Sequence, residues 1–363
     1  MRSVKTLDCT LRDGGYCNSW KFGKHNIDKV IKGLIESKVD YIECGYVSSF
    51  VDNNKDSTKF YSFELLNNII PIEKSNTKCL VMVNYGEVSL AQIPLRKESN
   101  VDGIRVAFHR DDWEKALLFC EQIQEKGYDV FVQPMVSMCY SDEEYSRLIE
   151  RVNKFNPYAF YIVDSFGMMK RNDVLHFAQL VEEKMNTDIM LGFHAHNNLQ
   201  LAFANAQCLV ELPFRREIIV DVSVHGMGRG AGNLNSELFL DYLNSVMEKT
   251  YNIKALLNLM DEVISPFYER HSWGYSLPNY LSATHAIHPN YAYYLSKKKT
   301  LTLEVMDELF ELIEMKKRYE YDEQYIEQLY VGYLSKRKDE YSTKKPLGSI
   351  VAKDITGLRR KIR

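Results

Sequence analysis

The sequence predicts a (β/α)₈ barrel followed by an all-helical extension. Short β-rich runs alternate with longer helical patterns along roughly the first 250 residues, and polar or ionisable side chains gather where the β-rich runs end. Such alternation is typical of parallel strands joined by crossover helices. Because the loops that follow the strands of a barrel build its active site, the polar clustering favours the same fold.

Eight β-rich runs follow one another, each ahead of a segment with helical periodicity. They span residues 4–10, 39–45, 78–83, 103–108, 129–134, 159–163, 189–194 and 218–224. Clear helical segments span 28–37, 113–126 and 142–155, and the last barrel helix covers about 235–249. An open doubly wound sheet is the rival fold, but it would carry a glycine-rich phosphate turn after the first strand, and none is present.

Beyond the last barrel helix, helical patterns continue without strands over 253–265, 280–286 and 303–317. We therefore expect a catalytic barrel over 1–250 and a helical extension over 251–363. Apolar residues repeat at helical spacing in the extension, at Leu303, Met306, Leu309, Phe310 and Ile313. This stripe would either cap the barrel or pair subunits, and we expect a homodimer.

Composition and charge argue against several classes of protein. The chain is 45% hydrophobic and 26% charged with a net charge of −3, as in an ordinary globular protein that recruits neither nucleic acid nor membrane by its overall field. A basic tail over the last thirty or so residues is interpreted as solvated. Seven scattered cysteines predict free thiols in a reducing compartment. With no apolar run of membrane-spanning length, we expect a cytoplasmic protein.

A candidate metal site combines two strand ends. His194 and His196 alternate around Ala195, so a strand places both imidazoles on one side, although two satisfied polar side chains would give the same pattern. Asp13 follows the first strand, which neighbours the eighth in a closed barrel, and offers a hard oxygen ligand; Asn233 could add a carbonyl oxygen. This set suits Mg²⁺ or Mn²⁺ as a Lewis acid, with Zn²⁺ or Fe²⁺ as alternatives.

Two further features accompany this set. Arg12 could neutralise an enolate oxygen, bind a carboxylate through two parallel hydrogen bonds, or form a structural ion pair with Glu43, and these roles are not exclusive. The segment from Gly226 to Asn233 has four glycines in eight positions. It permits close approach of the backbone to a ligand, or simply a tight turn.

Three motifs together resemble one family of metal-dependent barrels. They are Thr10-Leu11-Arg12-Asp13-Gly14, Gly192-Phe193-His194-Ala195-His196-Asn197, and the glycine segment ending at Asn233. Over residues 7 to about 249 the chain resembles the DRE-TIM metallolyase, or HMGL-like, superfamily, which contains 4-hydroxy-2-oxovalerate aldolase, hydroxymethylglutaryl-CoA lyase and isopropylmalate synthase. The resemblance implies metal binding by Asp13, His194 and His196, by Asn233 as in the lyase and synthase branches, and enolate stabilisation by Arg12.

Within the superfamily, residues 105–109 and 163–167 resemble the aldolase branch most. The resemblance implies a 4-hydroxy-2-oxo acid substrate and a pyruvate enolate, with Ser165 holding the carboxylate. His109 and Gln133 at strand ends are further candidates for substrate contacts, as is Tyr275, which a packed aromatic would also explain. Members of the lyase branch carry a catalytic cysteine in the corresponding glycine segment. No cysteine lies between Gly226 and Asn233 here, so the lyase branch is disfavoured.

One position departs from the aldolases, which carry a histidine base three residues after the metal aspartate. This chain has Tyr16 there, and a phenol is ordinarily protonated at neutral pH. Tyr16 nevertheless leads the candidates for the base, followed by His25 and His109, with Glu43 orienting Arg12 or relaying a proton. The segment from Thr10 to Tyr16 resembles family members from bacterial surface-polysaccharide gene clusters, which implies a sugar-derived substrate.

Two other functions stay open at this point. A Claisen-type synthase would join an acyl-CoA to a 2-oxo acid, and a CoA-dependent product would identify it. A non-catalytic metal-binding scaffold would explain the loss of the histidine base, but all the ligand residues remain, which argues against it.

Overall fold

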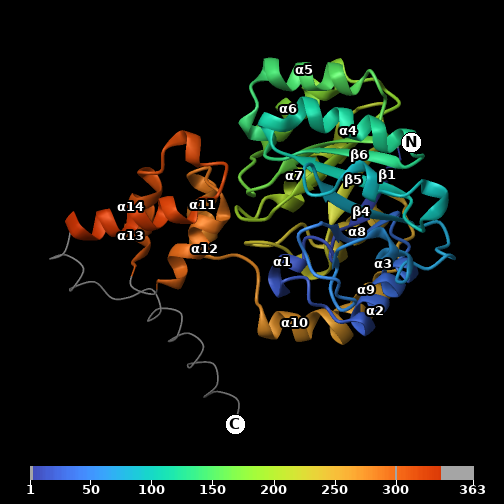
Figure 1. Cartoon of the computed structure of the whole chain (residues 1–363), viewed down its shortest axis with the longest axis horizontal. Coiled ribbons are helices and arrows are strands. Elements are labelled where there is room, and N and C mark those ends of the chain that lie inside the picture. Colours follow the sequence, from blue (N-terminus) through green and yellow to red (C-terminus); the bar gives the residue numbers. More distant parts are fainter. Residues whose placement is uncertain (1–2, 299–300, 337–363) are drawn as a thin grey trace, which may run out of the picture. The chain divides into compact units, whose positions relative to one another are not determined.

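A computed structural model describes residues 3–298 and 301–336 and confirms the predicted barrel (Figure 1). Eight parallel strands close into a ring because β1 pairs with both β2 and β9. The barrel strands are β1 Val4–Asp8, β2 Tyr41–Val47, β4 Lys78–Asn84, β5 Gly103–Phe108, β6 Asp129–Pro134, β7 Ala159–Asp164, β8 Met190–Ala195 and β9 Ile218–Val222. Each predicted β-rich run coincides with one of them.

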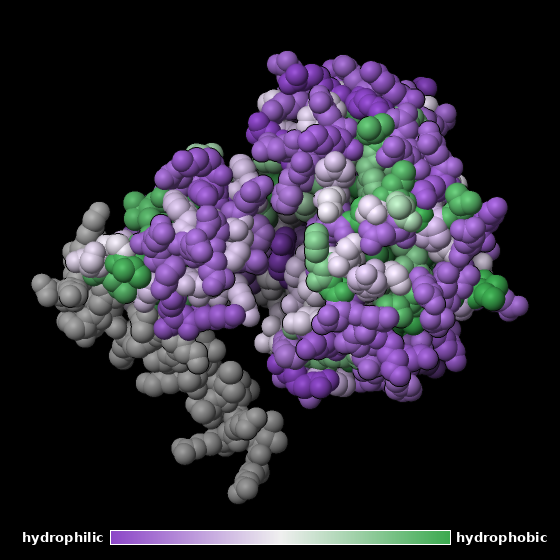
Figure 2. Space-filling model, in the orientation of Figure 1, coloured by the Kyte–Doolittle hydropathy of each residue, from purple (hydrophilic) through white to green (hydrophobic). Residues whose placement is uncertain are grey.

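The helices between the strands bury one face against the barrel. They are α2 Lys24–Glu36, α3 Phe63–Asn67, α4 Trp113–Glu125, α5 Asp142–Val152, α6 Arg171–Lys184, α7 Ala202–Glu211 and α8 Ser236–Met247. Helix α5 shows the pattern: Tyr145, Leu148, Ile149 and Val152 are buried at helical spacing. The outer surface of α4 and α5 is mainly hydrophilic (Figure 2). None of the described helices is long and apolar enough to cross a membrane.

Two short elements in the loops of the barrel were not predicted. Helix α1, Gly15–Asn18, is a single turn in the loop after β1, and β3, Lys59–Phe60, adds two residues beside the end of β2. Neither is long enough to show a period in the sequence. Both lie in loops at the carboxyl ends of strands, where the site is built.

The interior of the barrel changes character along its axis. Apolar and aromatic side chains fill the part of the interior farther from the carboxyl ends of the strands, among them Leu7, Tyr41, Leu80, Phe131 and Ile219. Two residues further along β2, β6 and β9, in the direction of the carboxyl ends, stand charged or polar residues, because side chains two positions apart on a strand point to the same side, here the interior. These include Glu43, Gln133 and Asp221, all buried. The strands thus place a charged layer beneath the loops.

The chain divides into two compact units, Met1–Gly274 and Tyr275–Arg363. The first unit includes α9 Ile253–Leu259 and α10 Ser265–Arg270, whose apolar residues join the barrel's core cluster. The second contains α11 Leu277–Thr284, α12 Pro289–Lys297, α13 Leu303–Glu311 and α14 Glu323–Lys336. The assignment of catalytic and extension domains stays a prediction, and the basic positions from 338 onward lie outside the described residues.

Candidate metal centre and active site

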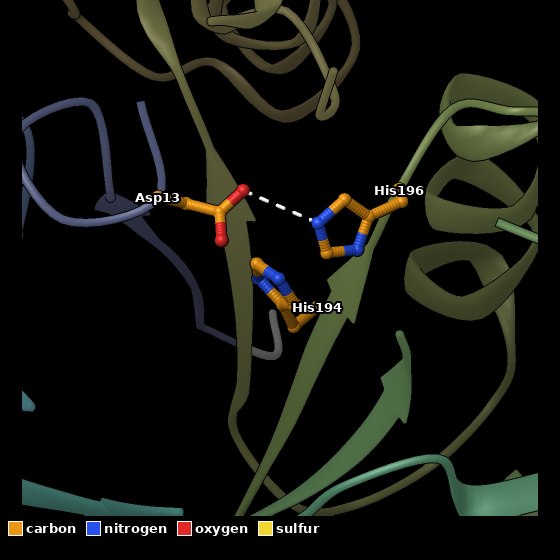
Figure 3. A group of neighbouring side chains, drawn as sticks. All are labelled: Asp13, His194 and His196. Carbon is orange, nitrogen blue, oxygen red and sulfur yellow. Dashed lines mark ion pairs between the residues drawn. The ribbon is translucent and has the colours of Figure 1, made fainter. Parts of the chain in front are cut away.

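Three ligand-type side chains converge at the carboxyl end of the barrel (Figure 3). Asp13 stands in the tight turn after β1, where its backbone N–H donates to the Cys9 carbonyl at 2.8 Å; His194 lies on β8 and His196 directly follows it. All three are buried, and their ligand atoms lie within 4.8 Å of one another. The closed barrel makes this possible by setting β1 two strands from β8, across β9.

Hydrogen bonds fix the orientation of both imidazoles. His194 Nδ1 lies 2.9 Å from Asp221 Oδ2, and His196 Nδ1 lies 3.2 Å from the Asp164 backbone carbonyl. Because a carboxylate and a carbonyl can only accept, each Nδ1 carries the hydrogen. Each Nε2 is thereby left as a potential ligand atom, the arrangement that commonly orients metal-binding histidines.

The electrostatics of the group fit a divalent cation. Burial lowers the pKa of His194 to about 4, so its imidazole is neutral at neutral pH. Burial alone would raise the pKa of Asp13, but Arg12 and the histidines outweigh it and hold that pKa well below its ordinary value. His196 Nε2 faces Asp13 Oδ2 at 3.2 Å and has no hydrogen-bond partner within the described chain. The lone pairs of His196 Nε2 and Asp13 Oδ2 point toward each other, and a cation between these two atoms would satisfy both.

Asn233 lies beside this group. Its backbone forms an isolated bridge with His196, and its Nδ2 donates to Asp13 Oδ2 at 2.7 Å. Its Oδ1 is buried and has no partner in the described part of the chain, so a carbonyl oxygen is available next to the other ligands. The glycine loop makes room for this: a Cβ on Gly228 would lie 2.2 Å from Asn233 Nδ2 and 2.8 Å from Asp13 Oδ2.

Arg12 forms the ion pair considered from the sequence and keeps a donor beyond it. Its Nε donates to Glu43 Oε2 at 2.7 Å and its Nη1 to Asp13 Oδ1 at 2.5 Å. Nη2 has no hydrogen-bond partner among the described residues, and the side chain is buried except for a small exposed part. The guanidinium is thus held rigidly with one donor group available to a substrate oxygen.

Two residues of this site, Arg105 and Asp221, received no role from the sequence. Arg105 on β5 donates from Nη1 to Glu43 Oε2 at 2.8 Å and from Nη2 to Asp221 Oδ2. Asp221 on β9 in turn holds His194. A charge in a strand buried on both faces needs a partner; that rule signals that Arg105 and Asp221 are each paired, but not with which residue.

The residues predicted to contact substrate lie in different settings. Ser165 is buried, and its Oγ accepts a hydrogen bond from the Val136 N–H at 2.9 Å. Gln133 is buried beside Arg105; with its amide oxygen toward the guanidinium it accepts from Nε at 3.1 Å. His109 is exposed immediately after β5, and Tyr275 begins the second unit with its side chain 54% exposed. Their roles in substrate binding stay predictions.

Tyr16 stands on α1, just beyond Asp13, and is 48% exposed. Its ring meets Trp20 edge-on at 4.6 Å between centroids, and the Arg229 guanidinium lies 5.3 Å from the ring centroid. Trp20 is fixed in turn because its Nε1 donates to the Arg12 carbonyl at 2.9 Å. His25, the second candidate for the base, is exposed in the first turn of α2.

Comparison with known proteins was made for the sequence and the fold. The family model described as HMGL-like matches residues 3–263. Among curated proteins, a 4-hydroxy-2-oxovalerate aldolase from Geobacillus genomosp. 3 is 24% identical over 73% of this chain and 78% of its own length. The enzyme of that name from Carboxydothermus hydrogenoformans is 27% identical over the same shares.

Solved structures agree with the fold. The N-terminal domain of an aldolase candidate from Bacteroides vulgatus is 28% identical with a TM-score of 0.67, covering 83% of this chain and 98% of that domain. Hydroxymethylglutaryl-CoA lyase from Bacillus subtilis is 15% identical with a TM-score of 0.59, over 73% of this chain and 93% of that one. At such low identity the lyase shows likeness of fold alone. These findings confirm the resemblance drawn from the motifs.

Proposed function

The chain belongs to the HMGL-like family, and on this basis we propose that it is a divalent-metal-dependent aldolase that cleaves a 4-hydroxy-2-oxo acid to pyruvate and an aldehyde, or joins the two in reverse. Its relatives named as aldolases make it an enzyme of the lyase class. The observation that supports the proposal most is the buried group of Asp13, His194 and His196, with ligand atoms within 4.8 Å of one another.

Asp13, His194 and His196 would hold the cation, and Asn233 Oδ1 is available beside them. When bound, a Mg²⁺ or Mn²⁺ ion would supply a Lewis acid toward the carbonyl and carboxylate oxygens of a 2-oxo acid. The mixed nitrogen and oxygen ligand set is compatible with Zn²⁺ or Fe²⁺ as well.

Arg12 is suited to the charge that the cleavage creates. Removal of the proton from the C4 hydroxyl lets the electron pair of the C3–C4 bond pass to the 2-oxo group, which releases the aldehyde and leaves an enolate. The enolate takes a proton at C3 and becomes pyruvate. A guanidinium held by Glu43 and Asp13, with Nη2 available, can stabilise the developing negative charge without first reorganising.

Tyr16 is our proposed base for the C4 hydroxyl. Its neighbours Trp20 and Arg229 hold the ring at the edge of the site, while half of its surface stays accessible. Geometry comes before proton affinity in choosing a base: Tyr16 follows Asp13 in the same turn, whereas His25 and His109 stand on other elements. The remaining part of the substrate is proposed to contact Ser165, His109 and Tyr275. We further propose that the aldehyde released by the cleavage is derived from a sugar.

The deciding experiment measures pyruvate release from a panel of 4-hydroxy-2-oxo acids, including sugar-derived ones, with Mg²⁺ or Mn²⁺ and after chelation. Release that needs the metal and is lost in His194→Ala would support the aldolase. If no substrate releases pyruvate while the protein binds metal stoichiometrically, the proposal fails, and formation of a CoA-dependent product would then favour an acyl-CoA condensation.

A further inference from the structure

Arg105 is the centre of a buried ionic network in the barrel interior. Its side chain is completely buried, and it comes from β5, three strands around the barrel from β1, which Asp13 follows. Nη1 donates to Glu43 Oε2 at 2.8 Å, Nη2 donates to Asp221 Oδ2, and the Tyr161 ring packs against the guanidinium with 4.8 Å between centres. A buried cation with two buried carboxylates is costly to assemble, so its presence calls for a reason.

Both carboxylates have a second partner in the site. Glu43 Oε2 also accepts from Arg12 Nε at 2.7 Å, and Asp221 Oδ2 also binds His194 Nδ1 at 2.9 Å. Arg105 therefore connects two chains of contacts. Through Glu43 it contacts Arg12, the proposed substrate-binding arginine, and through Asp221 it contacts His194, a candidate metal ligand. A planar guanidinium offers donors in two fixed directions at once, which a lysine ammonium does not.

We propose that Arg105 is a positioning residue that holds Glu43 and Asp221 in register and so sets the orientation of Arg12 and His194. The inference rests on the proposed function, because the orientation matters through metal and substrate. Without the guanidinium the two carboxylates would be buried side by side without a shared cation. Asp221 would then be free to turn, and the His194 Nε2 would lose its fixed direction toward Asp13.

The test is the affinity of the purified, metal-free protein for Mn²⁺, measured from the resonance signal of free Mn²⁺ in a titration. Arg105→Lys keeps the charge but replaces the rigid fork of donors by a single ammonium on a flexible chain, and we expect Mn²⁺ to bind about 10- to 100-fold more weakly. Asp221→Asn should weaken binding to a similar degree. The double variant should be little worse than either single one, because both act on His194 along one path.

Arg216→Lys is the matched control. Arg216 is also buried, but it pairs with Glu182 and with backbone carbonyls of Met185 and Ile189, away from the metal group. This variant should lower the melting temperature and leave Mn²⁺ affinity unchanged. If Arg105→Lys behaves in the same way, folded with unaltered affinity, then Arg105 serves the core alone and the inference is overturned.

A second variant covers the case in which Arg105→Lys does not fold. Gln133→Leu removes the amide that accepts from Arg105 Nε, so the guanidinium loses a contact that fixes its plane between the two carboxylates. Several-fold weaker Mn²⁺ binding by this variant supports the positioning role, and unchanged binding contradicts it. Asp13→Asn separates the two proposals: if Mn²⁺ still binds when this ligand is gone, the proposed metal site itself is wrong.

Discussion

At the scale of the residue, Tyr16 allows a direct test of the proposed chemistry. Tyr16→Phe removes only the hydroxyl, while the ring keeps its contacts with Trp20 and Arg229. Loss of a general base typically lowers kcat about 100- to 10,000-fold, and we expect a fall in this range with KM nearly unchanged. Steady-state assays of pyruvate release would measure both.

The matching variant Tyr16→His restores the residue that the resembling aldolases carry at this position. It should keep measurable activity where Tyr16→Phe has lost it. Mn²⁺ affinity should be the same in all three proteins, because the phenol is not among the ligand group. A phenylalanine variant with full activity would exclude Tyr16 as the base and turn attention to His109.

Asp8 makes the stability of the fold depend on pH. Its carboxylate accepts from the Thr10 N–H at 2.9 Å and from Ser236 Oγ at 2.7 Å, which ties the end of β1 to the start of α8. Burial raises the pKa of Asp8 to about 6 despite these bonds. The folded state therefore binds more protons than the unfolded state between about pH 4 and 6, and this group's contribution to the free energy of unfolding falls by about 3 kcal/mol as pH rises through that window.

Asp8→Asn should remove this dependence, since an amide can accept from Thr10 and donate to Ser236 without ionising. The variant and the parent should be similarly stable near pH 4, and the variant should become the more stable of the two above pH 6. Urea unfolding of both metal-free proteins at several pH values gives the difference, in which the other ionisable groups cancel. Parallel stability curves would show that Asp8 does not ionise with a raised pKa.

At the scale of the element, the glycine segment from Gly226 to Asn233, which follows β9, shapes the metal centre. Gly228 needs no unusual backbone angle, but a Cβ there would overlap Asn233 Nδ2 at 2.2 Å. Gly228→Ala should therefore displace Asn233 and Asp13, and we expect Mn²⁺ to bind at least about tenfold more weakly. Calorimetric titration would measure this.

Gly33→Ala in α2 is the control, because its Cβ meets Leu259 only at ordinary contact distance, 3.5 Å. Alanine in a helix interior should raise the free energy of unfolding by about 0.5–1 kcal/mol and leave metal affinity unchanged. Equal affinity in the Gly228 and Gly33 variants would show that the loop adapts and that its glycines are not required for the site.

The elements also show what the sequence could predict. The eight strands were predicted because each is a short β-rich run with a helical pattern after it, and Asp13, His194 and His196 followed from strand ends that a closed barrel brings together. Arg105 and Asp221 lie 116 residues apart in the chain. Their pairing depends on strand tilt and inward direction across the barrel, which no local pattern contains, so neither received a role.

At the scale of the whole molecule, the helical part after residue 274 has a core of its own. The predicted stripe contributes Met306, Leu309, Phe310 and Ile313 to it, together with Tyr291 from α12 and Ile326 from α14. Helices α12 and α14 were not predicted, so the stripe had no visible partner within its own unit. From the sequence, we expected the stripe either to cap the barrel or to pair subunits. The structure shows these four residues of the stripe packed within their own unit. The homodimer stays a prediction.

The division of the chain after Gly274 leads to a final prediction about where the catalytic part ends. Leu256, Leu259, Ile264 and Phe267 are buried in the barrel's core cluster. Each such side chain contributes about 1.5–3 kcal/mol to the free energy of unfolding, and the four together approach the whole stability of a typical domain, about 5–15 kcal/mol.

A protein ending at residue 250 should therefore show no cooperative thermal transition. One ending at residue 274 should melt cooperatively and bind Mn²⁺ as tightly as the full chain, since every residue of the metal group lies before that point. Cooperative melting of the shorter protein at the temperature of the longer one would mean that α9 and α10 add nothing to the barrel, and would support a boundary at 250.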